Sequence, residues 1–241
     1  MPPLNVDLGF AISVTDIRAN ETYENMKDVV KYIVSTQGIA NIRYGIILFA
    51  DSANTYIPFS HTFPDKGTLM SLLDAFPAPL GSPDLQKALD EAKSMFDKAP
   101  SRRPGAKKVL VVIMDKKSIN DAIAIRKAAT GLEEEDIQVI PVGVGANVDD
   151  EHLESITSNK KNVITTDKDG DPSSVGKEIL EKIIQGKDYI KNSGVEVVLK
   201  AGCHCKCEHW VIFHFRLLVP RTNYGSCQYY LSMRSSICYC N

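Results

Sequence analysis

Cysteine is missing from most of this 241-residue chain, because all six cysteines lie at or after Cys203. Disulfides therefore cannot stabilise the first part, which must fold by burying an apolar core and is long enough to do so. We predict a main domain over residues 5–187 and a separate cysteine-rich, irregular tail over residues 188–241.

Long hydrophobic runs and an excess of charge of one sign are also missing. No apolar stretch approaches the roughly 18 residues that a membrane-spanning helix needs, and the first residues lack the basic start and apolar core of a signal peptide. The formal net charge is only -2, so no net field attracts nucleic acid or an anionic membrane. We expect no nucleic-acid partner and no membrane span.

Three glycine-based motifs of enzymes are absent. The chain has neither the Gly-x-Ser-x-Gly elbow of serine hydrolases nor the Gly-x-x-x-x-Gly-Lys-Ser/Thr phosphate loop. The segment after the first predicted strand, "ISVTDIRAN", has no glycine for a dinucleotide-binding turn. No catalytic set can be assembled from the remaining loop residues, and we predict that the protein is not an enzyme.

The first part of the chain contains strand and helix patterns in alternation. Apolar runs rich in β-branched residues predict strands, and apolar residues at helical spacing predict helices. The predicted strands cover residues 6–14, 42–50, 55–59, 109–114, 137–144 and 163–165. The predicted helices cover residues 23–34, 82–96, 118–132 and 173–184. Ser82 is the expected N-cap of the second helix, with Pro83 at its first position, and Pro141 suggests that its strand lies near a sheet edge or ends there.

This order of elements predicts an α/β fold: a doubly wound, mostly parallel central sheet with helices on both faces. Only "DSAN" joins the strands at 42–50 and 55–59, which predicts a hairpin and one antiparallel edge strand. In such sheets, ligands bind beside the carboxyl ends of the strands, where the strand order reverses. The candidate loops are therefore 13–20, 82–84 and 115–120.

Six segments of the main domain match one family in its own order. They are "DLGFAIS", "ENMKDVVKYIV", "RYGIILFADSA", "PDLQKALDEA", "KKVLVVIMDKKSIND" and "IQVIPVGVG". In these segments the chain resembles the von Willebrand factor A (vWA) domain, the module of matrilins, type VI collagen chains and integrin α subunits. The resemblance implies a Rossmann-like fold and an extracellular, secreted protein that binds other proteins in matrix assembly or cell adhesion.

Members of that family usually carry a metal-ion-dependent adhesion site. Its pattern is Asp-x-Ser-x-Ser after the first strand, a Thr before the third helix and an Asp after the fourth strand. In this chain the five positions fall on Ser13, Thr15, Ile17, Pro83 and Asp115, so only Asp115 is intact. Mg²⁺ and similar cations require oxygen ligands, usually with carboxylate charge. The remaining candidate ligands for Mg²⁺ or Mn²⁺ are Ser13, Thr15 and Asp115, and we predict a degenerate site with no cofactor.

The residues of these loops have simpler roles as well. Ser13 and Thr15 are expected to form hydrogen bonds to their own loop, as Ser and Thr do in turns. Asp115 fits equally well as a ligand for a metal or partner and as a polar residue that ends a strand.

The predicted binding face comprises Asp16, Ser82, Asp84, Asp115 and Lys116. We expect this face to bind protein partners such as matrix components or collagen without metal, in a monomer or in a homo- or hetero-oligomer. The alternative is an intracellular scaffold subunit of a multiprotein complex, which reduced cysteines would favour.

The tail allows three interpretations. Six cysteines in a short segment are typical of disulfide-bonded secreted proteins. The cluster "CHCKCEH" at residues 203–209 also suggests metal binding, although zinc ligands usually come in pairs spaced Cys-x2-4-Cys. Thirdly, the tail forms no domain at all.

Overall fold

A computed structural model describes most of the chain. The chain divides into two compact units, residues 1–187 and 188–241. Up to the end of the last helix, the described residues are 4–13, 20–78, 81–100, 103, 105–148, 150–167 and 170–192. Beyond that helix they are residues 212–213, 216–217, 228–232 and 235–239. No helix in these ranges is long and apolar enough to cross a membrane.

The first unit is built on a six-stranded sheet of order β3-β2-β1-β4-β5-β6. Its strands are β1 (Val6–Ser13), β2 (Ile42–Phe49), β3 (Ala53–Ile57), β4 (Lys107–Met114), β5 (Ile137–Val144) and β6 (Ile164–Thr166). All neighbouring pairs are parallel except β2 and β3, which form the antiparallel edge hairpin. The predicted α/β fold class is confirmed.

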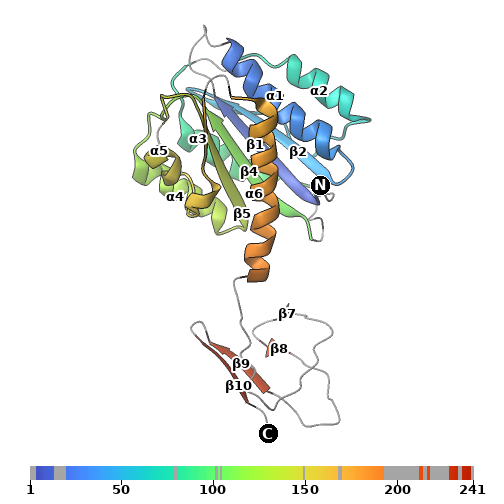
Figure 1. Ribbon diagram of the computed structural model, residues 1–241, viewed down its shortest axis with the longest axis vertical. Helices are drawn as coiled ribbons and strands as arrows, with labels where there is room; N and C mark the ends of the chain where they lie inside the picture. Colours follow the sequence, from blue (N-terminus) through green and yellow to red (C-terminus); the bar gives the residue numbers. More distant parts are fainter. Residues whose placement is uncertain are drawn as a thin grey trace. The chain divides into compact units, whose positions relative to one another are not determined.

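Helices cover both faces of this sheet (Figure 1). The helices α1 (Asn20–Gln37), α2 (Lys66–Asp74) and α6 (Pro172–Asn192) contribute to one core cluster, and α3 (Leu85–Asp97), α4 (Ala122–Glu133) and α5 (Asp150–Ser155) to the other. A short 3-10 turn, Lys160–Asn162, precedes β6. The side chains of β1 alternate between the two clusters, since Phe10 belongs to the first and Ala11 to the second.

Helix α3 packs closely on the sheet because β2 carries a glycine beneath it. A Cβ at Gly45 would lie 2.7 Å from Met95 Sδ and 3.0 Å from the Phe59 ring. A larger residue there would have to displace the end of the Met95 side chain, which packs between α3 and the sheet.

Two local predictions need correction. The N-cap of α3 is Asp84 rather than Ser82, because the Asp84 side chain accepts the hydrogen bond from the Lys87 N–H. The helix expected from residue 118 begins at Ala122, since Asp121 caps it. Residues 118–120 are thereby left free to form a loop at the end of β4.

Pro141 lies within β5, which is not an edge strand of the sheet. However, β6 pairs only with Val142–Val144. At Pro141 one side of β5 therefore has no paired strand, so a residue without an N–H is tolerated there.

The second unit contains two short antiparallel strand pairs where we predicted no regular structure. They are β7 (Ile212–Phe213) with β8 (Arg216–Leu217), and β9 (Gln228–Ser232) with β10 (Ser235–Tyr239). The predictions of disulfides or a metal in this tail concern side chains that lie outside the described residues.

Candidate functional site

The carboxyl ends of β1 and β4 mark the point where the strand order reverses. The chain passes from β1 to β2 on one side, and then crosses through α3 to β4 on the other. Ser13 pairs with Met114 in the parallel ladder, and Asp115 follows directly. Ser13 and Asp115 therefore lie at the switch point, where ligands of such sheets bind.

The loop before α3 is anchored to the end of β2. The Asp84 N–H donates to Ala50 O at 2.9 Å, and the Ser82 N–H donates to the Asp51 carboxylate at 2.9 Å. Gly81 has a φ of +131°, and a Cβ there would lie 2.6 Å from an Asp51 carboxylate oxygen. Glycine is required at this position both by its backbone conformation and by the space available.

The same loop is joined to the loop after β4 by hydrogen bonds. The Ile119 N–H donates to Pro83 O at 3.1 Å. The Ser118 hydroxyl accepts from the Leu85 N–H at 3.1 Å, and the Asn120 side-chain oxygen accepts from the Gln86 N–H at 3.0 Å. We call these three contacts the loop clamp. They join two of the three candidate loops directly.

His152 extends this arrangement to α5, because its Nε2 accepts the Ser118 N–H at 3.2 Å. Sequence reasoning included residues 115–120 in the candidate face but gave no role to Ser118, Asn120 or His152. Asp121 was the available signal, because an N-cap there places residues 118–120 in a loop.

Asp84 is committed to structural contacts. Its carboxylate caps α3 and forms an ion pair with Lys87 Nζ at 2.9 Å. Partial burial would raise the pKa of Asp84, but hydrogen bonds from Lys87 and Asn120 outweigh burial and hold the pKa below its usual range. The carboxylate is therefore not free to replace the lost threonine of the adhesion site.

Ser13 is fully buried at the end of β1. Its hydroxyl has no hydrogen-bond partner among the described residues, and the loop to which it is expected to bond lies outside them. Thr15 and Asp16 lie outside the described residues. Ser82 and Lys116 are exposed, and Asp115 is partly buried and already engaged in an interaction.

The described residues do not fit a divalent metal site. Ser13 offers a neutral oxygen where the pattern has a carboxylate, and Asp84 is bound to Lys87. No group of three His, Cys, Asp or Glu side chains in the described ranges could hold a metal ion. This donor set falls short of the carboxylate-rich coordination that Mg²⁺ prefers.

The family model of the von Willebrand factor type A domain matches residues 10–182. The chain belongs to this family. As a vWA domain it is a module of a kind that generally mediates protein–protein interaction.

Solved structures share this vWA fold at low sequence identity. Proximal thread matrix protein 1 from the mussel byssus is 23% identical over 74% of this chain, with a TM-score of 0.66. A von Willebrand factor type A protein from Catenulispora acidiphila is 16% identical over 75% of this chain, covering 42% of its own length, with a TM-score of 0.58. The TRAP protein of Plasmodium vivax is 16% identical over 73% of both chains, with a TM-score of 0.57.

This vWA chain spans 47% of the mussel protein's length. One structure of the mussel protein has a zinc-occupied MIDAS motif, the metal-ion-dependent adhesion site, and the Plasmodium protein is manganese-loaded. Metal binding therefore occurs among the structural neighbours.

The loop clamp leads to a stability prediction for Ser118→Ala. The substitution leaves the Leu85 N–H without its acceptor and should lower the free energy of unfolding by about 1–2 kcal/mol. Urea denaturation of both proteins measures the difference. Ser60→Ala, at an exposed position, is the matched control and should change the stability by less than about 0.5 kcal/mol. Equal stability of the two variants would contradict the clamp.

Proposed function

We propose that this vWA domain binds a protein of the extracellular matrix or cell surface through the loops 82–84 and 115–120 and the first turn of α4. The observation that carries the proposal is the exposure of two aliphatic side chains. Ile119 is 63% exposed and Ile123 is 82% exposed. Among the described residues, Tyr56 is the one other exposed large hydrophobic side chain, at 43%.

These two isoleucines lie beside the switch point and not at a random part of the surface. Ile119 belongs to the clamped loop, and Ile123 follows the Asp121 cap of α4. Exposed Lys116 adds a positive charge to the same loop. Apolar side chains with a charged neighbour are the composition expected of a protein interface.

Recognition proceeds without metal in this proposal. In a metal-dependent site the ion joins the loops, whereas here the loop clamp joins two of them directly. The preformed loops lose little conformational entropy when a partner binds, so an ion is not required to order them.

The proposal also holds that the domain catalyses no reaction. His152 Nε2 is occupied by the Ser118 N–H, and Asp84 is occupied by Lys87 and the N-cap of α3. Neither group is available as a general base for a substrate at this face.

The extracellular location is supported by the cysteine-rich tail and by the mussel byssus neighbour, a thread matrix protein. Counting free thiols in the native protein tests this point. Disulfides that account for the six cysteines would agree with secretion, and six free thiols would favour the intracellular scaffold instead.

Surface plasmon resonance of the full chain over triple-helical collagen and over solubilised matrix proteins tests the binding face. We expect binding in EDTA and in Mg²⁺ with the same affinity. Ile123→Asp should weaken binding at least about tenfold, as loss of a central apolar contact does. Glu181→Gln, on an exposed position of α6, is the control and should bind as the unmodified chain does. Binding that EDTA abolishes, or that Ile123→Asp leaves intact, would overturn the proposal.

A further inference from the structure

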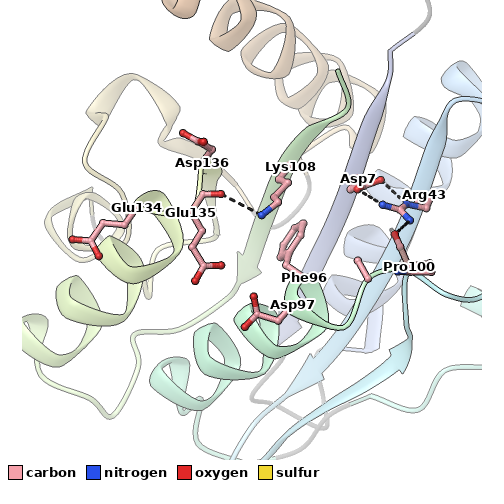
Figure 2. Close-up of a pocket in the computed structure, with 10 residues that line it drawn as sticks. Asp7, Arg43, Phe96, Asp97, Pro100, Lys108, Glu134, Glu135 and Asp136 are labelled. Carbon is pink, nitrogen blue, oxygen red and sulfur yellow. Dashed lines mark hydrogen bonds and ion pairs between the residues drawn. The ribbon is translucent and has the colours of Figure 1, made fainter. Parts of the chain in front are cut away.

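A pocket lies at the amino-terminal ends of the strands, opposite the candidate site. It has a volume of about 400 Å³ (Figure 2), within the range of small-ligand sites. Figure 2 shows the Asp7–Arg43 pair on one side, the turn 134–136 on the other and Lys108 between them. Its lining residues are Asp7, Arg43, Phe96, Asp97, Ala99, Pro100, Lys108, Glu134, Glu135 and Asp136.

The sheet register brings the charged residues of three strands together here. Asp7 of β1 pairs with Arg43 of β2 on one side and with Lys108 of β4 on the other. The remaining wall comes from the end of α3 and from the turn that joins α4 to β5. The pocket is thus built entirely within the first unit, away from the loop clamp.

The basic groups of the lining are held by neighbours. Arg43 donates from Nε to Asp7 at 2.7 Å and from Nη1 to Pro100 O at 2.6 Å. Lys108 Nζ donates to Glu135 O at 3.2 Å. These contacts partly satisfy the charged groups of Arg43 and Lys108 in the protein without a ligand.

The acidic groups exceed these cations. Five lining residues are acidic and two are basic, and Arg103, which lies outside the lining, also pairs with Asp7. The Glu135 carboxylate forms an ion pair with Lys93. By contrast, Asp97, Glu134 and Asp136 have no ion pair with any residue in the described part of the chain, and all three are exposed at the rim. With Arg103 and Lys93 counted, five acidic groups face four cations, so the pocket has an excess of one negative charge, and the carboxylates without an ion pair lie at its rim.

Two helix ends add to this negative potential. Helix α3 ends at Asp97 and helix α4 ends at Glu133, so the carboxyl-terminal turns of both adjoin the pocket. The carbonyl groups of a helix C-terminus carry partial negative charge and favour a cation nearby. This contribution comes from the backbone and is independent of the acidic side chains.

The pocket also has an apolar wall. Phe96 is fixed by a tilted ring contact with Phe59, with centroids 4.8 Å apart, and Ala99 and Pro100 lie beside it in the lining. An aliphatic stem can pack on this wall while a cationic end reaches the carboxylates, as Lys and Arg side chains do elsewhere.

We propose that this pocket binds a lysine or arginine side chain presented by a partner protein. The pocket is open on the side where Asp97, Glu134 and Asp136 lie. A small free ligand gains most from a site that encloses it, whereas a side chain held by a partner needs only its end to enter. The assignment gives the domain a second contact point, separate from the face at residues 82–84 and 115–120.

Amide ¹H–¹⁵N spectra of the full chain, titrated with N-acetyl-lysine N-methylamide, test this inference. We expect saturable shifts at Phe96, Lys108 and Asp136, with a dissociation constant on the order of 1 mM for so small a probe. The norleucine analogue, which has the stem without the charge, should produce no saturable shifts. Equal shifts with both probes, or none with the lysine probe, would overturn the proposal.

Two pairs of substitutions test where the lysine probe binds. Glu134→Gln with Asp136→Asn should weaken binding of the lysine probe about fivefold, and asparagine tolerates the positive φ of residue 136. The control pair Asp90→Asn with Glu181→Gln removes two exposed charges elsewhere and should leave the dissociation constant unchanged. Equal weakening in both pairs would refute the site. Pentylamine, a free amine with the same stem and the same single charge, should bind more weakly than the lysine probe, and tighter binding of pentylamine would refute the side-chain occupant.

Discussion

Replacing Asp7 by alanine should lower the free energy of unfolding by about 3 kcal/mol, because two arginines would lose their shared carboxylate. Asp7 is 6% exposed. Arg43 reaches both of its carboxylate oxygens, and Arg103 reaches Oδ1. The variant would keep both guanidinium groups partly buried without their counter-ion, which is the costly way to break such a network.

Urea unfolding at neutral pH measures this loss. Asp28→Ala is the matched control, because Asp28 pairs with Lys31 at 3.1 Å but its side chain is 48% exposed. A surface pair of this kind contributes less than about 1 kcal/mol. Comparable losses in the two variants would show that the Asp7 network is no stronger than a surface ion pair.

The Asp7 contribution should also depend on pH. Burial would raise the pKa of Asp7, but the hydrogen bonds and charges of Arg43 and Arg103 outweigh burial and hold the pKa below its usual range. The contribution is therefore fully present above the unfolded-state value of about 3.9 and is lost as the pH falls towards the folded-state pKa. The stability difference between the unmodified chain and Asp7→Ala should shrink below about pH 4. A difference that stays constant down to pH 3 would contradict this assignment.

The strands were predictable because their signal is local. The run 109–114 is apolar at every position, as expected for a strand covered on both faces, and β4 contains it with two added residues, Lys107 and Lys108. Both added residues are charged, and their place in the strand depends on pairing with β1. The sequence pattern does not show which strand pairs with these residues, so the amino-terminal end of β4, which lines the pocket, could not be predicted from the sequence.

The candidate site was less predictable because its contacts join distant residues. Ser82 and Asp84 are both good N-cap residues, and only the anchoring of the Asp84 N–H to Ala50 decides between them. The side chains of Ser118 and Asn120 accept from backbone groups 33 and 34 positions away. Ile17 and Pro83 show in the sequence that the metal-site pattern is incomplete. The hydrogen bonds that join the loops could not be predicted from the sequence.

Ser13 distinguishes a metal-free site from a metal-dependent one. Ser13→Asp restores the first residue of the family pattern, but it places a carboxylate at a fully buried position where no described group is within hydrogen-bond distance of the present hydroxyl. An unpaired buried charge is expensive, so we expect a loss of about 3 kcal/mol in the free energy of unfolding in EDTA. Ser13→Ala is the control and should change the stability by less than about 1 kcal/mol, because it removes a hydroxyl that has no partner among the described residues.

Thermal unfolding with added Mg²⁺ completes this test. Mg²⁺ should leave the midpoint of the unmodified chain and of Ser13→Ala unchanged. Added Mg²⁺ should restore part of the stability that Ser13→Asp loses, because this variant has a second carboxylate at the switch point beside Asp115. An ion that binds only the folded state stabilises that state. A midpoint that rises with Mg²⁺ in the unmodified chain and not in Ser13→Ala would mean that Ser13 is a ligand in a working site. The loop clamp would then act together with the ion and not in its place.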